Sequence, residues 1–282
     1  FDLYRLSTKR KATPQRLNLT YEGDSLHEPL SRTLLRQAKH AAFTRDGLEI
    51  AFIAGGDVWV MDTVLKEPRQ ITRTPEEESE VLFAGDDKSL YFTSSAGGQP
   101  DIWRATPKDP KLAFWQNTEF PLIKITDDDA HEYSLAINPR KPLLSFLRGR
   151  GDLWVVAPDG KNPKRIIESW NSPHYDWSPD GNWLTFAIDD ANFNRDVYVY
   201  ELDSKTPPFN LSRHPDDDYS PVWSPNGKTI AFLGRREGTE IDIHYVQLQK
   251  KDSEESSRDR KLEAATKKIN AARKKPPAKN SS

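Results

Sequence analysis

The fold is decided by Tyr175-Asp176-Trp177-Ser178-Pro179-Asp180-Gly181-Asn182-Trp183-Leu184-Thr185-Phe186, and Asp196-Val197-Tyr198-Val199-Tyr200 completes the pattern. Ser178 to Gly181 matches a type I turn, because proline at the second position pre-sets φ and glycine at the fourth supplies conformational freedom. On both sides of the turn, apolar and polar residues alternate, and aromatic and β-branched types dominate, as is typical of strands. The stretch therefore predicts a strand, a tight turn, a second strand, a loop and a third strand.

The same pattern recurs along the chain. Trp223-Ser224-Pro225-Asn226-Gly227 and Phe43-Thr44-Arg45-Asp46-Gly47 repeat the turn, and weaker copies run from Phe83 to Phe92 and from Ile137 to Phe146. The phenylalanine that ends the second strand falls at positions 52, 92, 146, 186 and 232, so successive copies lie 40, 54, 40 and 46 residues apart. Strand-rich repeats of about 40–50 residues with four strands per unit are the signature of β-propeller blades.

The repeats predict an all-β fold, a six-bladed β-propeller over residues 1–248, with seven blades in the parent protein as the alternative. Six aspartates begin the third-strand motifs: Asp2, Asp57, Asp101, Asp152, Asp196 and Asp242. The predicted blades hold two, four, four, four, four and three strands, so the first and last are incomplete in this chain. Because the two ends duplicate the third strand instead of completing one sheet, we expect an open ring with exposed strand edges at the seam.

Two segments depart from the repeat. Residues 21–36 are charged without alternation, and we expect a loop with a short helical turn at Leu34-Leu35. Residues 249–282 form a charged helical linker, which Pro276-Pro277 terminates. Its thin apolar stripe is typical of a solvated linker helix, and a coiled-coil or docking helix is the alternative. The stripe consists of Leu262, Ala265, Ile269 and Ala272.

Composition excludes several classes of function. The formal net charge is −2, and it divides into about −8 for the body and about +6 for the tail. An acidic body argues against a nucleic-acid partner, which requires a basic stripe on a folded face. The absence of cysteine excludes disulfides, a thiol nucleophile and cysteine metal sites, and it does not fix the compartment. No apolar run approaches the ~20 residues of a membrane-spanning helix, so no membrane span is expected.

One face of the predicted propeller is heavily charged. Acidic clusters follow the fourth strands at 76–78, 127–129 and 216–218, and the loops between strands two and three carry arginines. Both kinds of connection lie on the same face of an antiparallel blade. A guanidinium group can fork onto a carboxylate, so we predict a peptide-binding rim there. The alternative is aspartate-rich turns that bond their own backbone, with arginine keeping the loops soluble. The rim candidates are Arg148, Arg150, Arg235 and Arg236.

The sequence offers no constellation for catalysis or for a cofactor. A G-x-S-x-G elbow, an H-x-x-x-H pair and an H-E-x-x-H pair are all missing. Residues 127–129 lack the alternating oxygen ligands of a calcium loop. Four histidines fall one per blade near the blade entrances, which would disperse them around the ring: His40, His131, His174 and His214. We therefore expect no catalytic residue, no metal and no cofactor in this chain.

Several segments carry a family resemblance that covers most of residues 1–248. The run 220–232, Ser-Pro-Val-Trp-Ser-Pro-Asn-Gly-Lys-Thr-Ile-Ala-Phe, resembles the TolB-type propeller repeat nearly throughout. Four further segments resemble the propeller region of tricorn-like serine proteases of the C-terminal-processing peptidase family. These segments are Gly56–Thr63, Trp115-Gln116-Asn117, Arg148–Trp154 and Asn210–Pro215.

The resemblance implies a non-catalytic role for this chain, because the catalytic residues of that family lie downstream of its propellers and no position here matches them. The chain would act as scaffold, gate or peptide conduit beside a downstream PDZ and peptidase region, in a bacterial or archaeal protein of the periplasm or, less favoured, the cytoplasm. Its partners would be peptides or unfolded polypeptide, and the parent would form a homo-oligomer. The alternatives are a stand-alone TolB-like protein-interaction propeller and the propeller half of a prolyl-oligopeptidase-type enzyme.

Overall fold

The computed structural model describes residues 3–5, 7–8, 13–17, 35, 37–236, 238–254 and 256–274. The chain divides into two compact units, Phe1–Arg36 and Gln37–Ser282. In the first unit, β1 (Leu3–Arg5) pairs antiparallel with β2 (Gln15–Leu17), in agreement with the predicted third and fourth strands. The predicted helical turn at Leu34-Leu35 lies outside the described residues, since only Leu35 of that pair is described.

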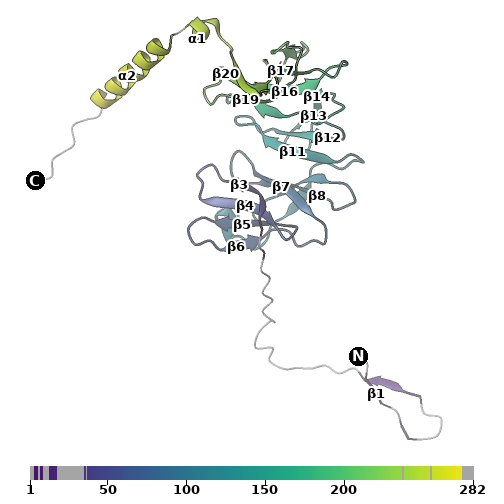
Figure 1. The fold of residues 1–282 in the computed structure, drawn as a ribbon. Coiled ribbons are helices and arrows are strands. Elements are labelled where there is room, and N and C mark those ends of the chain that lie inside the picture. The colour runs from purple at the N-terminus through teal and green to yellow at the C-terminus, as the bar shows by residue number, and fades with distance from the viewer. Residues whose placement is uncertain are drawn as a thin grey trace, which may run out of the picture. The chain divides into compact units, whose positions relative to one another are not determined.

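The second unit contains five antiparallel sheets in chain order, and each is a simple meander (Figure 1). Four sheets have four strands and the last has three, as the repeats predict, so the all-β propeller fold is confirmed. The first two sheets are β3 (Lys39–Phe43), β4 (Glu49–Ala54), β5 (Asp57–Asp62), β6 (Pro68–Gln70), and β7 (Glu78–Phe83), β8 (Leu90–Ser94), β9 (Asp101–Ala105), β10 (Leu122–Lys124). The third and fourth are β11 (Glu132–Ile137), β12 (Leu144–Arg148), β13 (Asp152–Val156), β14 (Lys164–Ile167), and β15 (Tyr175–Trp177), β16 (Trp183–Asp189), β17 (Arg195–Glu201), β18 (Phe209–Asn210). The last is β19 (Asp218–Trp223), β20 (Thr229–Gly234) and β21 (Asp242–Gln247).

Helical structure is confined to three described segments. The 3₁₀ helix η1 (Phe114–Gln116) lies between β9 and β10, and α1 (Lys250–Glu254) and α2 (Ser257–Lys274) follow the last sheet. The 18 residues of α2 correspond to about five turns, and α2 contains the predicted apolar stripe. Among the described helices, none has the length and apolar character needed to cross a membrane.

The strand-one to strand-two turns form as the sequence predicts. The Gly181 N–H donates to the Ser178 carbonyl at 2.8 Å, and Gly181 has a φ of +70°, which glycine adopts readily. The Asp180 carboxylate also accepts bonds from the Ser178 hydroxyl at 2.5 Å and from the Asn182 N–H at 3.0 Å. The aspartate after the proline therefore closes the turn through its side chain.

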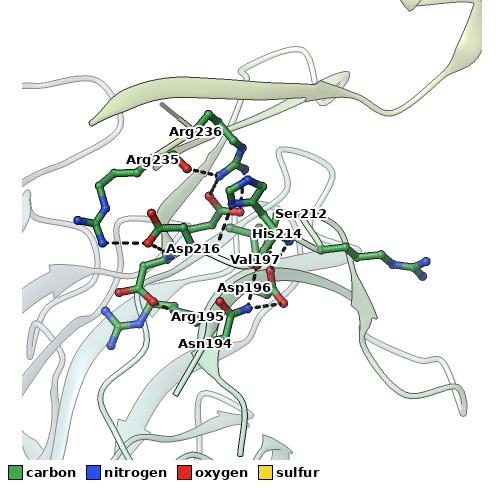
Figure 2. A network of polar contacts seen from close by, with 12 residues as sticks. Asn194, Arg195, Asp196, Val197, Ser212, His214, Asp216, Arg235 and Arg236 are labelled. Atoms are coloured by element: carbon green, nitrogen blue, oxygen red, sulfur yellow. Dashed lines mark hydrogen bonds and ion pairs between the residues drawn. The ribbon is translucent and has the colours of Figure 1, made fainter. Parts of the chain in front are cut away.

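In three of the described third strands, the aspartate of the motif accepts hydrogen bonds from the fourth strand or the connection after it: Asp57, Asp152 and Asp196. Asp196 accepts hydrogen bonds from Asn210 Nδ2 at 2.7 Å, from Ser212 Oγ at 2.9 Å and from the His214 N–H at 3.1 Å (Figure 2). These donors lie on β18 and on the connection that leads to the next sheet. A buried carboxylate is stabilised by such bonds, which explains why the third-strand motif begins with aspartate.

Adjacent sheets pack face to face through their apolar side chains. Trp177, Leu184 and Phe186 of one sheet pack against Leu147 and Leu153 of the preceding sheet. The repeats predict that Trp177 and Trp223, which occupy equivalent positions before their turns, are core residues, and this is confirmed for Trp177, since only 6% of it is exposed. The matching prediction for Trp223 is wrong. Trp223 is half-buried because it faces a pocket of about 910 Å³ between the last two sheets instead of a packed neighbour.

The connection from β9 to β10 folds back onto the preceding sheet. Phe114 is buried, stacks on Phe120 with ring centroids 5.3 Å apart, and meets Phe83 edge to face at 5.6 Å. The Trp115 N–H donates to Oε1 of Glu49 on β4 at 2.7 Å. Phe114 also belongs to the buried cluster that contains Val58 and Val60 of β5, so the insert adds an apolar and a polar contact between sheets β3–β6 and β7–β10.

Native-state hydrogen exchange should follow this packing. We expect slow amides around Phe146 and Phe186, whose side chains are fully buried in central strands, and fast amides around Leu3 and Tyr245. Tyr245 lies on β21, which among the described strands pairs with β20 alone. Exchange measured by mass spectrometry would contradict the assignment of the sheet edges if protection were uniform along the chain.

Candidate interaction face

The charged loops and the acidic connections lie on one face, as predicted. Arg148, at the end of β12, forms an ion pair at 2.9 Å with Asp128 of the connection between β10 and β11. Arg235, after β20, forms an ion pair at 2.9 Å with Asp216 of the connection between β18 and β19 (Figure 2). We call this surface the charged face. It consists of the loops between second and third strands and the connections from fourth strands to the next first strand.

Arg148 is committed to a buried network inside its own blade. Its Nε donates to Oε1 of Glu132 at 2.9 Å, and its guanidinium group lies 4.7 Å from the centre of the Trp154 ring. Glu132 is fully buried and also accepts a bond from the Thr126 hydroxyl at 2.8 Å. Burial raises the pKa of the Glu132 carboxyl to about 7, although Thr126 and Arg148 both oppose the rise. The main role of Arg148 is therefore to compensate a buried carboxylate.

Arg236 has the same role in the last sheet. It donates two hydrogen bonds to the carboxylate of Asp218, at 2.7 and 2.9 Å, and Asp218 is completely buried. Of the four predicted rim arginines, two are thus held by buried carboxylates. Arg235 keeps part of its guanidinium group in solvent, and Arg150 is exposed. A peptide-binding role for the rim stays a prediction, and Arg150 and Arg235 are its accessible members.

An exposed aromatic pair on the charged face escaped the sequence analysis. Trp170 and Phe193 meet edge to face with ring centroids 5.3 Å apart, although 49% of Trp170 and 74% of Phe193 are exposed. Trp170 follows β14 and Phe193 lies in the loop between β16 and β17. Beside them, Arg195 Nε donates to Asp189 at 2.6 Å, and Asn171 donates to the same carboxylate. The sequence signal that could have indicated this pair is the presence of a large aromatic residue in each of two otherwise polar connections.

Polar residues occupy the bulges of the first strands. His40, Glu80, Ser134 and Ser220 all have φ between 48° and 54°, and each lies where the pairing register of its strand shifts. The Ser220 hydroxyl lies 3.0 Å from Nδ1 of His174, which is the separation of a nucleophile and its base. In the described part of the chain, however, no carboxylate bonds the His174 ring, and no group of three potential metal ligands occurs.

Comparisons with known proteins show which proteins this chain resembles. No protein-family model matches the chain. The "Tricorn protease homolog" of Saccharolobus solfataricus is 27% identical over 103 residues, which are 34% of this chain and 9% of that protein. The "Tol-Pal system protein TolB" of Helicobacter pylori is 27% identical over 133 residues, which are 46% of this chain and 31% of that protein. The chain therefore matches less than a third of the length of each of these relatives.

Solved structures agree at the level of the fold. The putative TolB from Agrobacterium tumefaciens superposes with a TM-score of 0.52 at 12% identity, over 75% of this chain and 77% of that one. The tricorn protease superposes with a TM-score of 0.57 at 12% identity, over 84% of this chain and 24% of that one. The chain is a β-propeller. Its repeats and these similarities make it a TolB-like propeller.

Proposed function

We propose that this chain is a protein-interaction propeller that binds an extended polypeptide across its charged face. The observation that carries the proposal is the exposed pair of Trp170 and Phe193 beside Arg195. Tryptophan and arginine are among the residues that most often dominate the energy of a protein interface, and two exposed aromatic rings in contact form a continuous apolar patch, unlike a single exposed side chain. The similarity to TolB, whose name describes part of a protein assembly, supports this class of function.

The mixed charge of the face favours a polypeptide over a strongly charged partner. Asp189 and Asp216 stand next to Arg195 and Arg235, so that acidic and basic groups alternate over short distances. Such a surface can pair with the backbone and with side chains of either sign, while the two aromatic rings supply apolar contact. A polyanion would instead meet the repulsion of the acidic connections.

The proposal can be tested with a labelled unfolded polypeptide. We expect fluorescein-labelled casein to bind the chain, and the double substitution Trp170→Ala and Phe193→Ala to weaken binding by about tenfold or more. Phe43→Ala provides a matched control, because Phe43 is also exposed but lies on β3. Fluorescence anisotropy is the measurement. Equal affinities for the double variant, the control and the unmodified chain would remove the aromatic pair as the binding site.

Within this class, the finer proposal is a propeller segment of a tricorn-like peptidase that serves as scaffold, gate or peptide conduit. Support comes from the 27% identity to the Saccharolobus protein and from the superposition on the tricorn protease. The residues that cleave the peptide would then belong to another part of that protein, because the described residues bring together no complete nucleophile, base and acid.

We accordingly expect no peptidase activity from this chain alone. The Ser220–His174 pair is the nearest approach to a catalytic arrangement, and without an orienting carboxylate it should turn over no detectable peptide. The measurement is cleavage of fluorogenic peptides by purified chain and by Ser220→Ala. Turnover that survives purification and disappears in Ser220→Ala would show that the pair is catalytic.

A further inference from the structure

A second site lies on the opposite face, where the strand-one to strand-two turns of three successive sheets meet. A pocket of about 380 Å³ opens there. Its lining includes Arg45 from the turn between β3 and β4, Gly85 from the turn between β7 and β8, and residues 138–143 from the turn between β11 and β12. Pro158, in the turn between β13 and β14, closes one side. The pocket is thus separate from the charged face.

The pocket concentrates positive charge in an acidic protein. Arg45, Arg104, Arg140 and Lys141 line it, and Asp86 is the single acidic residue among its described lining. Lys141 has a carboxylate partner, Asp203, at 3.4 Å. The three arginines form no ion pair with any described residue, whereas four arginines on the charged face, Arg148, Arg195, Arg235 and Arg236, are paired at 2.6 to 2.9 Å. The body around this pocket carries about −8, so a group of four cations that lines one pocket with a single acidic residue runs against the overall charge of the body.

The Nε–H of Arg104 is buried and makes no hydrogen bond with any described residue. The same guanidinium group donates from Nη1 to the Pro158 carbonyl at 3.0 Å. The hydroxyl of Tyr91, a residue that is 2% exposed, lies 3.4 Å from the same carbonyl. A buried N–H without an acceptor destabilises a protein, and such groups are rare in native structures. An acceptor brought by a ligand would remove this penalty.

We propose that this pocket binds a small phosphomonoester through its phosphate group. Guanidinium groups recognise phosphate by charge-assisted hydrogen bonds, and a tetrahedral dianion offers three oxygens to donors that arrive from several directions. The buried Nε–H of Arg104 donates to the phosphate, and Arg45, Arg140 and Lys141, which also line the pocket, neutralise its charge. A carboxylate has two coplanar oxygens and a single charge, so it satisfies fewer of these donors. The volume suits a small molecule.

Gly85 offers an independent way to block the site. A Cβ built on Gly85 would lie 3.7 Å from Arg45 Nη2 and 3.7 Å from Ile137 Cγ2, which are ordinary contact distances. Gly85 does not have a positive φ, so the backbone accepts a side chain there. In Gly85→Glu, the new carboxylate lies beside Arg45 and competes with the ligand from within the chain.

Isothermal titration calorimetry at low ionic strength tests the proposal with four probes: inorganic phosphate, glycerol 3-phosphate, sulfate and acetate. We expect glycerol 3-phosphate to bind, and Arg104→Met to weaken its binding by about tenfold or more. Gly85→Glu should weaken binding similarly while keeping Arg104. Arg69→Met is the control, because Arg69 is exposed on β6 and lies outside the pocket. Folding of each variant is checked by circular dichroism.

The probes distinguish the possible sources of the anion. Tighter binding of glycerol 3-phosphate than of inorganic phosphate or sulfate supports the phosphomonoester. Equal binding of all three dianions would overturn that ligand class in favour of a free inorganic anion. Acetate binding as tightly as phosphate would overturn the dianion requirement. An absence of binding, or equal losses in Arg69→Met and Gly85→Glu, would overturn the site.

Discussion

Phe186→Ala should lower the free energy of unfolding by about 3–5 kcal/mol, the usual loss when a large aromatic side chain is deleted from a packed core. Phe186 is fully buried at the centre of β16. Its ring stacks on Tyr198 of β17 with centroids 6.0 Å apart, and it packs against Leu147 and Leu153 of the preceding sheet. The substitution therefore opens a cavity that two neighbouring sheets share.

Equilibrium urea unfolding, followed by tryptophan fluorescence, measures the loss. Phe209→Ala is the matched control, because Phe209 is half exposed on β18 and should cost less than about 1 kcal/mol. Trp223→Ala should fall between the two, since Trp223 faces the pocket between the last two sheets. Equal losses for Phe186→Ala and Phe209→Ala would mean that the sheets do not pack in the register described here.

The second large effect is expected from Arg148→Met, which removes the cation that compensates buried Glu132. Breaking one partner of a buried ion pair destabilises a protein by about 3–5 kcal/mol, because an uncompensated charge remains in the interior. Methionine keeps an unbranched apolar stem and removes the guanidinium group, including its contact with the Trp154 ring. The decrease in the free energy of unfolding should be largest at pH 8, where the Glu132 carboxyl is ionised in the unmodified chain.

The pH dependence identifies the carboxyl group responsible. The pKa of Glu132 is about 7 in the folded chain, and its ordinary value of 4.5 applies to the unfolded chain. The folded chain therefore binds this proton more tightly than the unfolded chain does. The stability that protonation contributes is fully present below pH 4.5 and is lost as the pH rises through about 7. In Arg148→Met the pKa rises further, because the nearby positive charge that lowers it is gone. The cost of the substitution should therefore shrink between pH 8 and pH 5.

Urea unfolding of Arg148→Met and of unmodified chain at pH 5 and pH 8 checks this result. Arg150→Met is the control, because Arg150 is exposed and close in sequence, and its substitution should change stability by less than about 0.5 kcal/mol at either pH. A cost for Arg148→Met that is the same at both pH values would show that packing of the side chain, and not the charge of Glu132, accounts for the loss.

The features that the sequence predicted well are local. Ser178 to Gly181 specify their turn by residue type, and the alternation on both sides specifies which residues face the core. Asp196 could be placed at the start of a third strand because the motif recurs at a regular interval. Each of these signals lies within a few residues of its structural consequence, which explains why the number of strands in every sheet followed from the sequence.

The roles of the arginines depend on carboxylates that lie on other strands of the same sheet. The spacing of the repeats along the sequence did not reveal these pairs. Arg148 and Arg236 are separated by 16 and 18 residues from the carboxylates that hold them, and only the packed blade brings each pair together. Trp170 and Phe193 belong to different connections, so their contact has no signature along the chain. The same holds for the phosphate pocket, whose lining comes from three successive sheets.

The back-folded insert between β9 and β10 should change the order in which the sheets unfold. In a linear array, stability is approximately a sum of terms for each repeat and for each interface between neighbours. The packing of Phe114 with Val58 and Val60 of β5 and the bond from Trp115 to Glu49 both add to the interface between sheets β3–β6 and β7–β10. Sheets β3–β6 and β7–β10 should thus behave as a single cooperative folding unit, and partial unfolding that begins at the last sheet should stop before it separates them.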